Sequence, residues 1–135
     1  MASILRVNTL TDASSNNSTA MSVINQGTAK CWTRFDGTGT PSHADSFNMG
    51  SITDTGTGNQ TTSFTSNMGS GNYSATVNAK LHSLSANEYR QTTVDTFAAG
   101  SIKVQSLEPF LGGGDTDLRQ VDNDLCCVTI LGDLA

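Results

Sequence analysis

The fold of this chain is decided by the stretch Gly27–Tyr73, GTAKCWTRFDGTGTPSHADSFNMGSITDTGTGNQTTSFTSNMGSGNY. The stretch is polar and rich in Thr, Ser and Gly, and glycine-containing turns interrupt its short apolar alternations. Alternation with a period of two is typical of half-buried strands, whereas an amphipathic helix repeats its apolar residues every three or four positions. The stretch therefore predicts a module of short antiparallel strands.

The clearest strand of the chain follows directly, at residues 73–81. Its odd-numbered positions are apolar or aromatic and its even-numbered positions are polar, as expected when one face of a strand covers a core. Weaker alternation predicts a strand at Thr61–Met68, and additional strands are expected at Ser101–Leu107 and Leu125–Leu131. Because sustained helical periodicity is almost absent, the predicted fold class is all-β, an antiparallel β-sandwich or a jelly-roll-like knob.

A hairpin is predicted over residues 45–68, where DSFNMGSITD and TTSFTSNM flank the glycine-rich TGTGNQ. Phe47 and Met49 share a parity that Ile52 breaks, so we expect a bulge or a strong twist near Gly50. These two features set the predicted shape of the central part of the chain.

The last predicted strand, Leu125–Leu131, reads LCCVTIL and is apolar on both parities, so we expect cover on both of its faces. A neighbouring subunit would supply the second face, which implies an oligomer. Alternatively, the strand is central in a two-layer sandwich and one parity is incompletely packed. Between the strands, Gly112–Gly114 predicts a loop, and Ser83–Gln91 has the apolar spacing of a short helix.

The composition bounds the size and the partners of the protein. The chain has 135 residues, enough for one domain with a moderate core. Its net charge is -5 and its Lys and Arg residues are scattered, which argues against nucleic acid as a partner. No apolar run approaches the roughly 20 residues of a membrane span, and the N-terminus lacks the apolar segment of a secretory signal. We therefore expect that the protein is made in a cytoplasm and does not insert into a membrane.

Metal and cofactor sites are not indicated. The cysteines, Cys31, Cys126 and Cys127, are odd in number and two are adjacent, so buried free thiols are expected rather than disulfides. There is no C-x-x-C and there are only two histidines, which leaves zinc without ligands at the usual spacing. The stretch GGGDTDLRQVDND lacks the central Gly and closing Glu of a calcium loop, so a solvated loop is preferred. Its aspartates are Asp115, Asp117, Asp122 and Asp124.

Catalytic motifs are also weak, so we predict that the protein is not an enzyme. Ser42, His43 and Asp45 lie close in sequence, but triads depend on geometry and no G-x-S-x-G motif supports one, so His43 is expected as an exposed loop residue. The glycines of DGTGT and DTGTGN lack the context of phosphate-binding loops and are predicted turn formers. Of the two glutamates, Glu88 and Glu108, the second precedes Pro109 in a predicted turn, and no acidic pair in a cleft is apparent.

Trp32 shares its strand face with the charged residues Lys30 and Arg34. Three interpretations remain open: burial at a subunit or capsid interface, where aromatic and Arg residues are enriched; packing of the Lys and Arg stems over the indole; or stacking against a sugar of a host-surface glycan. The opposite face carries the apolar residues Ala29, Cys31 and Phe35.

Three blocks of the sequence carry a family resemblance. ILRVNTLTDASSNNS, at Ile4–Ser18, is similar to the stretch x-L-x-V-[ND]-T-L-T-[ND]-A-S-G-N that opens segments of virion fibres in tailed bacteriophages, notably those of marine hosts. AKCWTRFDGTGT, at Ala29–Thr40, and the block at Asp45–Ser74 resemble a small β-module of phage tail fibres and related appendages. In that module the aromatic after A-K-x, the F-[ND]-G-T-G turn, the D-S-F-N strand, the T-D-x-G-T-G turn and a closing Tyr recur. Ser15 departs from the pattern, since Gly is common there, as does Cys31, which is often Ala.

The resemblance implies a structural protein of a bacteriophage virion, assembled in the host cytoplasm. It would form a homotrimeric fibre, spike, head fibre or capsid decoration by binding other virion proteins. Residues 1–20 would be a short extended attachment segment and residues 21–135 the sandwich knob. The alternative is a receptor-binding tail-fibre tip that recognises host polysaccharide or an outer-membrane protein. The predicted interface residues are Ile4, Leu5, Val7, Leu10, Trp32, Arg34, Cys126, Val128 and Ile130.

Overall fold

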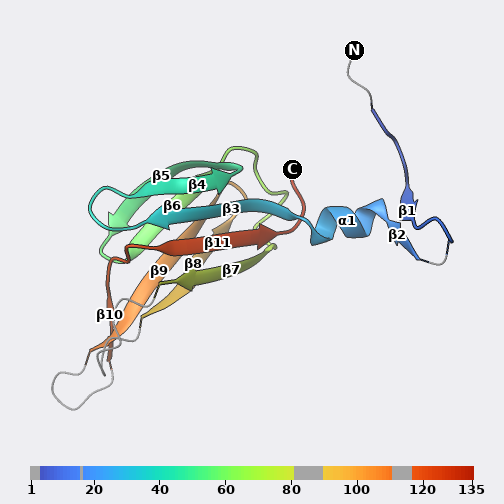
Figure 1. Cartoon of the computed structure of the whole chain (residues 1–135). Coiled ribbons are helices and arrows are strands. Elements are labelled where there is room, and N and C mark those ends of the chain that lie inside the picture. Colours follow the sequence, from blue (N-terminus) through green and yellow to red (C-terminus); the bar gives the residue numbers. More distant parts are fainter. Residues whose placement is uncertain (1–3, 16, 81–89, 111–116) are drawn as a thin grey trace.

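The computed structural model describes residues 4–15, 17–80, 90–110 and 117–135. Within these ranges the protein is an all-β structure in which antiparallel sheets pack together, so the predicted fold class is confirmed (Figure 1). Two sheets form a sandwich, and an N-terminal hairpin and a short helix extend from one end of it. No helix in the described part of the chain is long and apolar enough to cross a membrane.

The first sheet of the sandwich has four strands in the order β4-β3-β11-β7. All of its pairings are antiparallel. Its strands are β3 (Ala29–Asp36), β4 (Ser42–Phe47), β7 (Ser74–Ala79) and β11 (Cys126–Leu131). The two central strands, β3 and β11, are therefore far apart in the sequence.

The second sheet has five strands built around the long strand β9. One edge of β9 pairs first with β6 and then with β10, the other edge pairs with β8, and β5 pairs with the free side of β6. The strands are β5 (Met49–Gly56), β6 (Asn59–Phe64), β8 (Gln91–Ala98), β9 (Ser101–Phe110) and β10 (Asp117–Gln120).

The core lies between the two sheets. In β3, β7 and β11 the apolar side chains of one parity point inward and the other parity points outward, as the alternation predicts. Tyr73 closes one end of the core: its ring lies edge-on to Phe64, and its hydroxyl donates to the carbonyl oxygen of Ser101 at 3.0 Å. The buried apolar residues are Cys31, Phe35, Met49, Phe64, Met68, Tyr73, Ile102, Val104, Cys126, Val128 and Ile130.

The predicted hairpin over residues 45–68 is only partly right. The hairpin that forms is β5–β6, and residues 45–47 belong to β4 in the other sheet. The chain changes sheet at Asn48, whose φ of 54° turns the backbone between β4 and β5. The Asn48 side chain secures this crossing, because its Oδ1 accepts from the Ser66 amide at 2.7 Å and its Nδ2 donates to the Lys30 carbonyl at 3.2 Å.

The irregularity expected near Gly50 is confirmed. The β5–β6 register shifts between Met49 and Ile52. A Cβ on Gly50 would lie 2.8 Å from Oγ of Ser63, too close for any other residue without movement. A side chain at this position would therefore require the Ser63 hydroxyl to rotate away from its hydrogen bond with the Ser51 amide.

Three further expectations concern the cover of β11, a helix and a loop. Strand β11 buries Cys126, Val128 and Ile130, but on its other face Thr129 and Leu131 are exposed, so cover on both faces is not found within the described chain. The single chain therefore matches the alternative interpretation, in which β11 is a central strand of a two-layer sandwich and its outer face is incompletely packed. The helix expected over 83–91 falls almost wholly on residues outside the described ones, and Gln91 begins β8. The loop expected at 112–114 also lies outside them.

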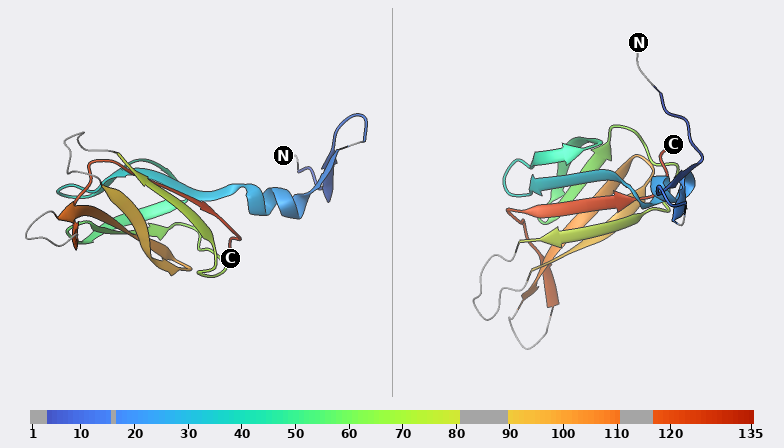
Figure 2. Two further views of the ribbon diagram at one scale, coloured as in Figure 1. Left: turned by 90° about the horizontal axis from the view of Figure 1, so that it is seen from below. Right: turned by 45° about the vertical axis from the view of Figure 1, so that its right-hand side comes forward.

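The N-terminal arm, residues 4–28, lies outside the sandwich. It consists of β1 (Thr9–Thr11), β2 (Ser18–Ala20) and α1 (Met21–Gly27). Figure 1 and the left view of Figure 2 show it continuing outward from the start of β3, at the end of the sandwich where the C-terminus also lies. The first strand of the sandwich begins at Ala29, and α1 lies between that strand and the predicted boundary after residue 20.

Candidate functional site

The arm exposes apolar side chains to solvent. Four of the predicted interface residues, Ile4, Leu5, Val7 and Leu10, are 74%, 82%, 37% and 47% exposed. Val23 on α1 is 60% exposed, and no residue of the helix is buried. Single exposed apolar residues are ordinary, but a whole segment of them with no core of its own is typical of an interaction surface.

Local hydrogen bonds hold the β1–β2 hairpin in shape. The Asp12 amide donates to the Asn17 carbonyl at 3.1 Å, and the Asn17 side chain donates to Oδ2 of Asp12 at 2.7 Å. Ser15, which stands where the resembled family often has Gly, has a φ of 60°. This left-handed conformation is the one that Gly adopts most easily, so Ser15 adds strain to the turn.

A second apolar surface lies on the outer face of the four-stranded sheet, which we define as its side turned away from the core. Trp32 and Phe47 are directly opposite each other in the β3–β4 register and are 37% and 54% exposed. Arg34 and Asp45 form the next pair along the same face. Trp and Arg are enriched in protein-binding hot spots, so contact of Trp32 and Arg34 with a partner stays a prediction for this exposed pair.

The remaining predicted interface residues are not available to a partner. Cys126, Val128 and Ile130 are at most 1% exposed and pack in the core of their own chain. The opposite parity of β11 faces outward instead, where Thr129 and Leu131 extend the outer face past Trp32. In the sequence of β11 both alternating sets of residues are apolar. The register of β11 against β3 therefore decides which set faces the core.

A groove of about 510 Å³ joins the arm to the sandwich. Gln26 of α1 forms one wall, and Ser70, Asn72, Tyr73 and Leu131 line the sandwich side. Since Leu131 belongs to the outer face as well, the arm, the groove and the outer face are continuous around this end of the molecule.

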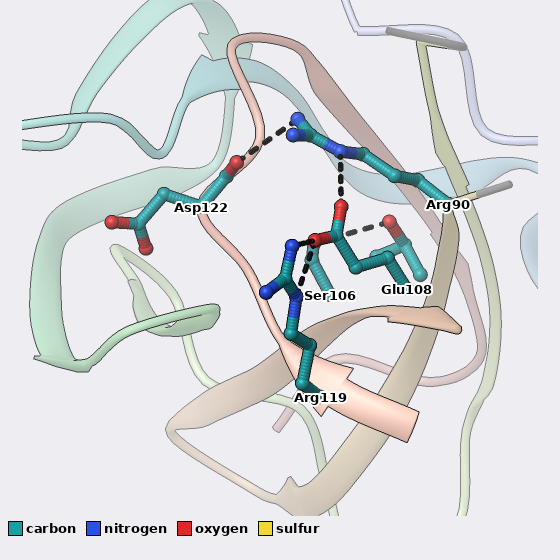
Figure 3. Close-up of polar contacts among 6 residues, drawn as sticks. Arg90, Ser106, Glu108, Arg119 and Asp122 are labelled. Atoms are coloured by element: carbon teal, nitrogen blue, oxygen red, sulfur yellow. Dashed lines mark hydrogen bonds and ion pairs between the residues drawn. The ribbon is translucent and has the colours of Figure 1, made fainter. Parts of the chain in front are cut away.

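The opposite end of the sandwich contains an ionic cluster in which Arg90 and Arg119 meet the buried Glu108 (Figure 3). Nε of Arg119 donates to Oε1 of Glu108 at 2.6 Å, and Nε of Arg90 donates to Oε2 at 3.2 Å. Arg90 also donates to the Asp122 carbonyl at 3.2 Å. The cluster therefore ties β9, β10 and the segment before β11 to Arg90, the residue that precedes β8.

Glu108 is only 5% exposed, yet it remains ionised. Burial opposes its charge, but hydrogen bonds and charges from Arg119 and Arg90 outweigh burial and lower the pKa of the carboxyl. Both oxygens are engaged by guanidinium groups, so the carboxylate is not positioned to accept a proton from a substrate. The cluster is a brace, and the turn expected at Glu108 is wrong because β9 continues to Phe110.

His43 is not the exposed loop residue that the sequence predicts. It lies on β4, is half-buried, and its Nδ1 is 2.7 Å from Oγ1 of Thr33. Burial lowers the pKa of the His43 imidazole. Oδ1 of Asp45 accepts from the Ser46 amide, and Ser42 pairs with Asp36. These contacts do not form a nucleophile, base and acid in series.

The aspartates considered as calcium ligands serve separate roles. Oδ1 of Asp122 accepts from the Gly58 amide at 2.7 Å, and Asp124 forms an ion pair with Lys80 at 2.9 Å. Asp115 lies outside the described residues, and of Asp117 only the backbone is described. Among the described residues, no three His, Cys, Asp or Glu side chains group closely enough to hold a metal ion. Cys31 and Cys126 are buried free thiols, as expected, and Cys127 is half-buried.

The sequence reasoning missed the ionic cluster and Phe47. A signal for the cluster was present, because Ile102, Val104, Ser106 and Glu108 share one parity. Extending the predicted strand past Leu107 would have placed Glu108 on the core face, where a carboxylate requires a cationic partner. A comparison of the chain with models of known protein families, with curated proteins and with solved structures finds no match.

Proposed function

We propose that this chain is a structural protein of a bacteriophage virion: a homotrimeric fibre, spike or capsid decoration that binds other virion proteins through its N-terminal arm. The observation that carries the proposal is the arm itself, an apolar segment that projects from a folded sandwich and is not buried by it. Such a division into a projecting anchor and a compact outer body suits a subunit that is held on a particle.

The resembled blocks coincide with these two parts. The block at Ile4–Ser18 forms the arm before α1, and the block at Ala29–Thr40 forms β3 and the turn after it. The block at Asp45–Ser74 runs from β4 to the start of β7 and includes Tyr73, whose ring closes the core. The recurring residues of the resembled module thus fall at strand, turn and core positions.

Removal of residues 1–20 tests the proposal. We expect the shortened protein to stay soluble and folded, since β1 and β2 are exposed throughout and contribute nothing to the core. In cells that assemble the phage encoding this chain, it should no longer join particles, as measured by mass spectrometry of purified virions. The full-length chain, expressed in the same way, is the control. Incorporation at the level of the full chain would contradict the proposal, as would absence of the full chain from particles.

A second candidate function is recognition of a host surface by the end of the sandwich that lies away from the arm. There the ionic cluster joins β9 and β10 and holds the Asp122 carbonyl, and the next residue, Asn123, accepts from the Gly37 amide at the start of the turn after β3. A braced end that points away from an anchor is suited to present binding loops. Binding of the isolated protein to host polysaccharide or host outer-membrane protein would favour this function over a purely structural one.

A further inference from the structure

The outer face of the four-stranded sheet carries two neighbouring rows of exposed side chains. From β4 to β7, the observed register gives the first row as Phe47, Trp32, Thr129 and Thr76. Arg34 and Asp45 are the β3–β4 pair of the second row, and both are exposed as well. Opposite side chains in such a sheet lie about 5 Å apart, so the rows form one continuous surface.

Arg34 and Asp45 have opposite charges and are directly opposite each other, yet they do not bind each other. Within the described part of the chain no ion pair joins them. Oδ1 of Asp45 accepts from the Ser46 amide at 2.8 Å, which leaves its second oxygen for a ligand. A guanidinium has only donors and a carboxylate only acceptors. The face therefore offers donors and acceptors side by side, next to the aromatic pair Trp32 and Phe47.

This combination matches the chemistry of a sugar ring. A pyranose has an apolar face of C–H groups and a rim of hydroxyls. Its apolar face can stack on the indole of Trp32, because an aromatic ring buries a large and rigid area. Each sugar hydroxyl is both a donor and an acceptor, so neighbouring hydroxyls can accept from Arg34 and donate to Asp45 together. Thr129 and Thr76 extend the row with hydroxyls of their own.

A protein partner matches this face less well. The buried centre of a protein interface is mainly apolar and depleted of Asp. Here Asp45 lies beside the aromatic pair, and burial of its unpaired charge under a protein would be costly. A bound sugar leaves the face partly wet, so the charged groups keep water as a further partner. Within the two rows the charges of Arg34 and Asp45 cancel, which favours a neutral sugar over an acidic one.

We infer that the outer face of the four-stranded sheet binds a neutral polysaccharide. Trp32 and Phe47 are the stacking platform, and Arg34 and Asp45 hold the sugar hydroxyls. This binding role rests on the second candidate function, recognition of a host surface, and gives it a ligand class and a face on the side of the sandwich. It requires neither the arm nor the homotrimer, because all four residues belong to β3 and β4 of one chain.

Tryptophan fluorescence tests the inference directly, because Trp32 is the only Trp of the chain. The full chain is titrated with mannan, laminarin and dextran, three neutral polysaccharides. At least one of them should change the emission of Trp32 in a saturable way. Alginate, an acidic polysaccharide, should bind more weakly than that polymer. No saturable change with any of the three, or binding of alginate at equal or higher affinity, would overturn the inference.

Matched substitutions locate the site. Asp45→Asn and Asp54→Asn each neutralise an exposed carboxylate whose Oδ1 accepts from a backbone amide, but Asp54 belongs to β5 of the other sheet. Asp45→Asn should raise the dissociation constant about 10-fold, and Asp54→Asn should leave it unchanged. Trp32→Ala, measured by calorimetry, should abolish binding, and circular dichroism checks that each variant is folded. Equal effects of the two Asp variants, or full binding by folded Trp32→Ala, would contradict the assignment.

Incorporation into virions separates this binding role from the proposed structural one. Polysaccharide binding by a chain that is absent from particles would support the inference and overturn the virion function. A chain that joins particles but binds none of the neutral polysaccharides would overturn the inference alone. If, in addition, Trp32→Ala no longer joined particles, the outer face would be assigned to a virion protein instead of a sugar.

Discussion

Glu108 keeps a carboxylate inside the sandwich because two guanidinium groups meet it there. The two arginines differ in exposure: the side chain of Arg90 is 11% exposed and that of Arg119 is 60% exposed. Exposed ion pairs contribute little to stability, whereas a buried charge that loses its partner is costly. Arg90 should therefore matter more to the fold than Arg119, although Arg119 makes the shorter contact.

Substitution of Glu108 tests this brace. Glu108→Gln should lower the free energy of unfolding at pH 7 by about 2 kcal/mol, since Arg90 is left buried without its counter-charge. Arg90→Gln should cost a similar amount and Arg119→Gln clearly less. Urea denaturation followed by tryptophan fluorescence measures all three, because Trp32 is the only Trp. Equal costs for the two arginine variants would show that exposure does not govern the cluster.

Single residues also mark where prediction from sequence stopped. The parity of Trp32 and Arg34 was predictable, because strand alternation alone places them opposite Cys31 and Phe35. The position of His43 was not, since the β3–β4 register shifts between Arg34 and Phe35 and turns His43 toward the core. An irregularity of one residue in a pairing reverses the side chains that follow it.

For the strands of the sandwich, positions were easier to predict than pairings. Strands β7, β9 and β11 were predicted within a few residues, because their alternation is determined by the core that they cover. The pairing of strands was predicted less well. The sequence DSFNMGSITD reads as one continuous strand, but β4 and β5 belong to different sheets. The chain crosses at Asn48 because this side chain bonds to the backbone of Lys30 and of Ser66, and these contacts are visible only in the folded structure.

Asn48 should therefore control the crossing between the sheets. Asn48→Ala removes the side-chain hydrogen bonds and keeps a β-carbon in the left-handed conformation, which Ala tolerates less well than Asn. Asn48→Gly removes the same bonds but accepts the conformation, so it is the matched control. We expect both variants to be destabilised and Asn48→Ala to be the worse by about 1 kcal/mol in chemical denaturation. If the two variants are equally stable, the backbone conformation at this crossing does not limit the fold.

At the scale of the whole molecule, stability should fall in two steps as the pH is lowered. Burial lowers the pKa of His43 in the folded state, so below about pH 6.5 the unfolded chain takes up a proton first and folding weakens. Glu108 has a lowered pKa in the folded state, so its contribution is complete above about pH 4.3 and is lost as the pH falls further. The two residues act in separate ranges of pH.

Melting temperatures measured from pH 8 to pH 3 test these two contributions to stability. His43→Gln should flatten the profile between about pH 6.5 and pH 5 and leave the lower range unchanged. Glu108→Gln should flatten part of the lower range, and its difference from the unmodified protein should shrink on acidification. The remaining acid sensitivity belongs in part to Asp36 and Asp95, whose pKa values are lowered by hydrogen bonds from Thr38 and Lys103. A profile for His43→Gln parallel to that of the unmodified protein would contradict the assignment.

The place of β11 between β3 and β7 has a consequence for how the protein is made. Both neighbours are synthesised earlier, and each presents a row of unpaired backbone groups until β11 arrives to join them. Open strand edges are templates for pairing with other chains, and contacts between distant segments form slowly. The period between synthesis of β7 and insertion of β11 is therefore when nascent chains are most prone to aggregate, and chaperones that bind incomplete chains should act in that interval.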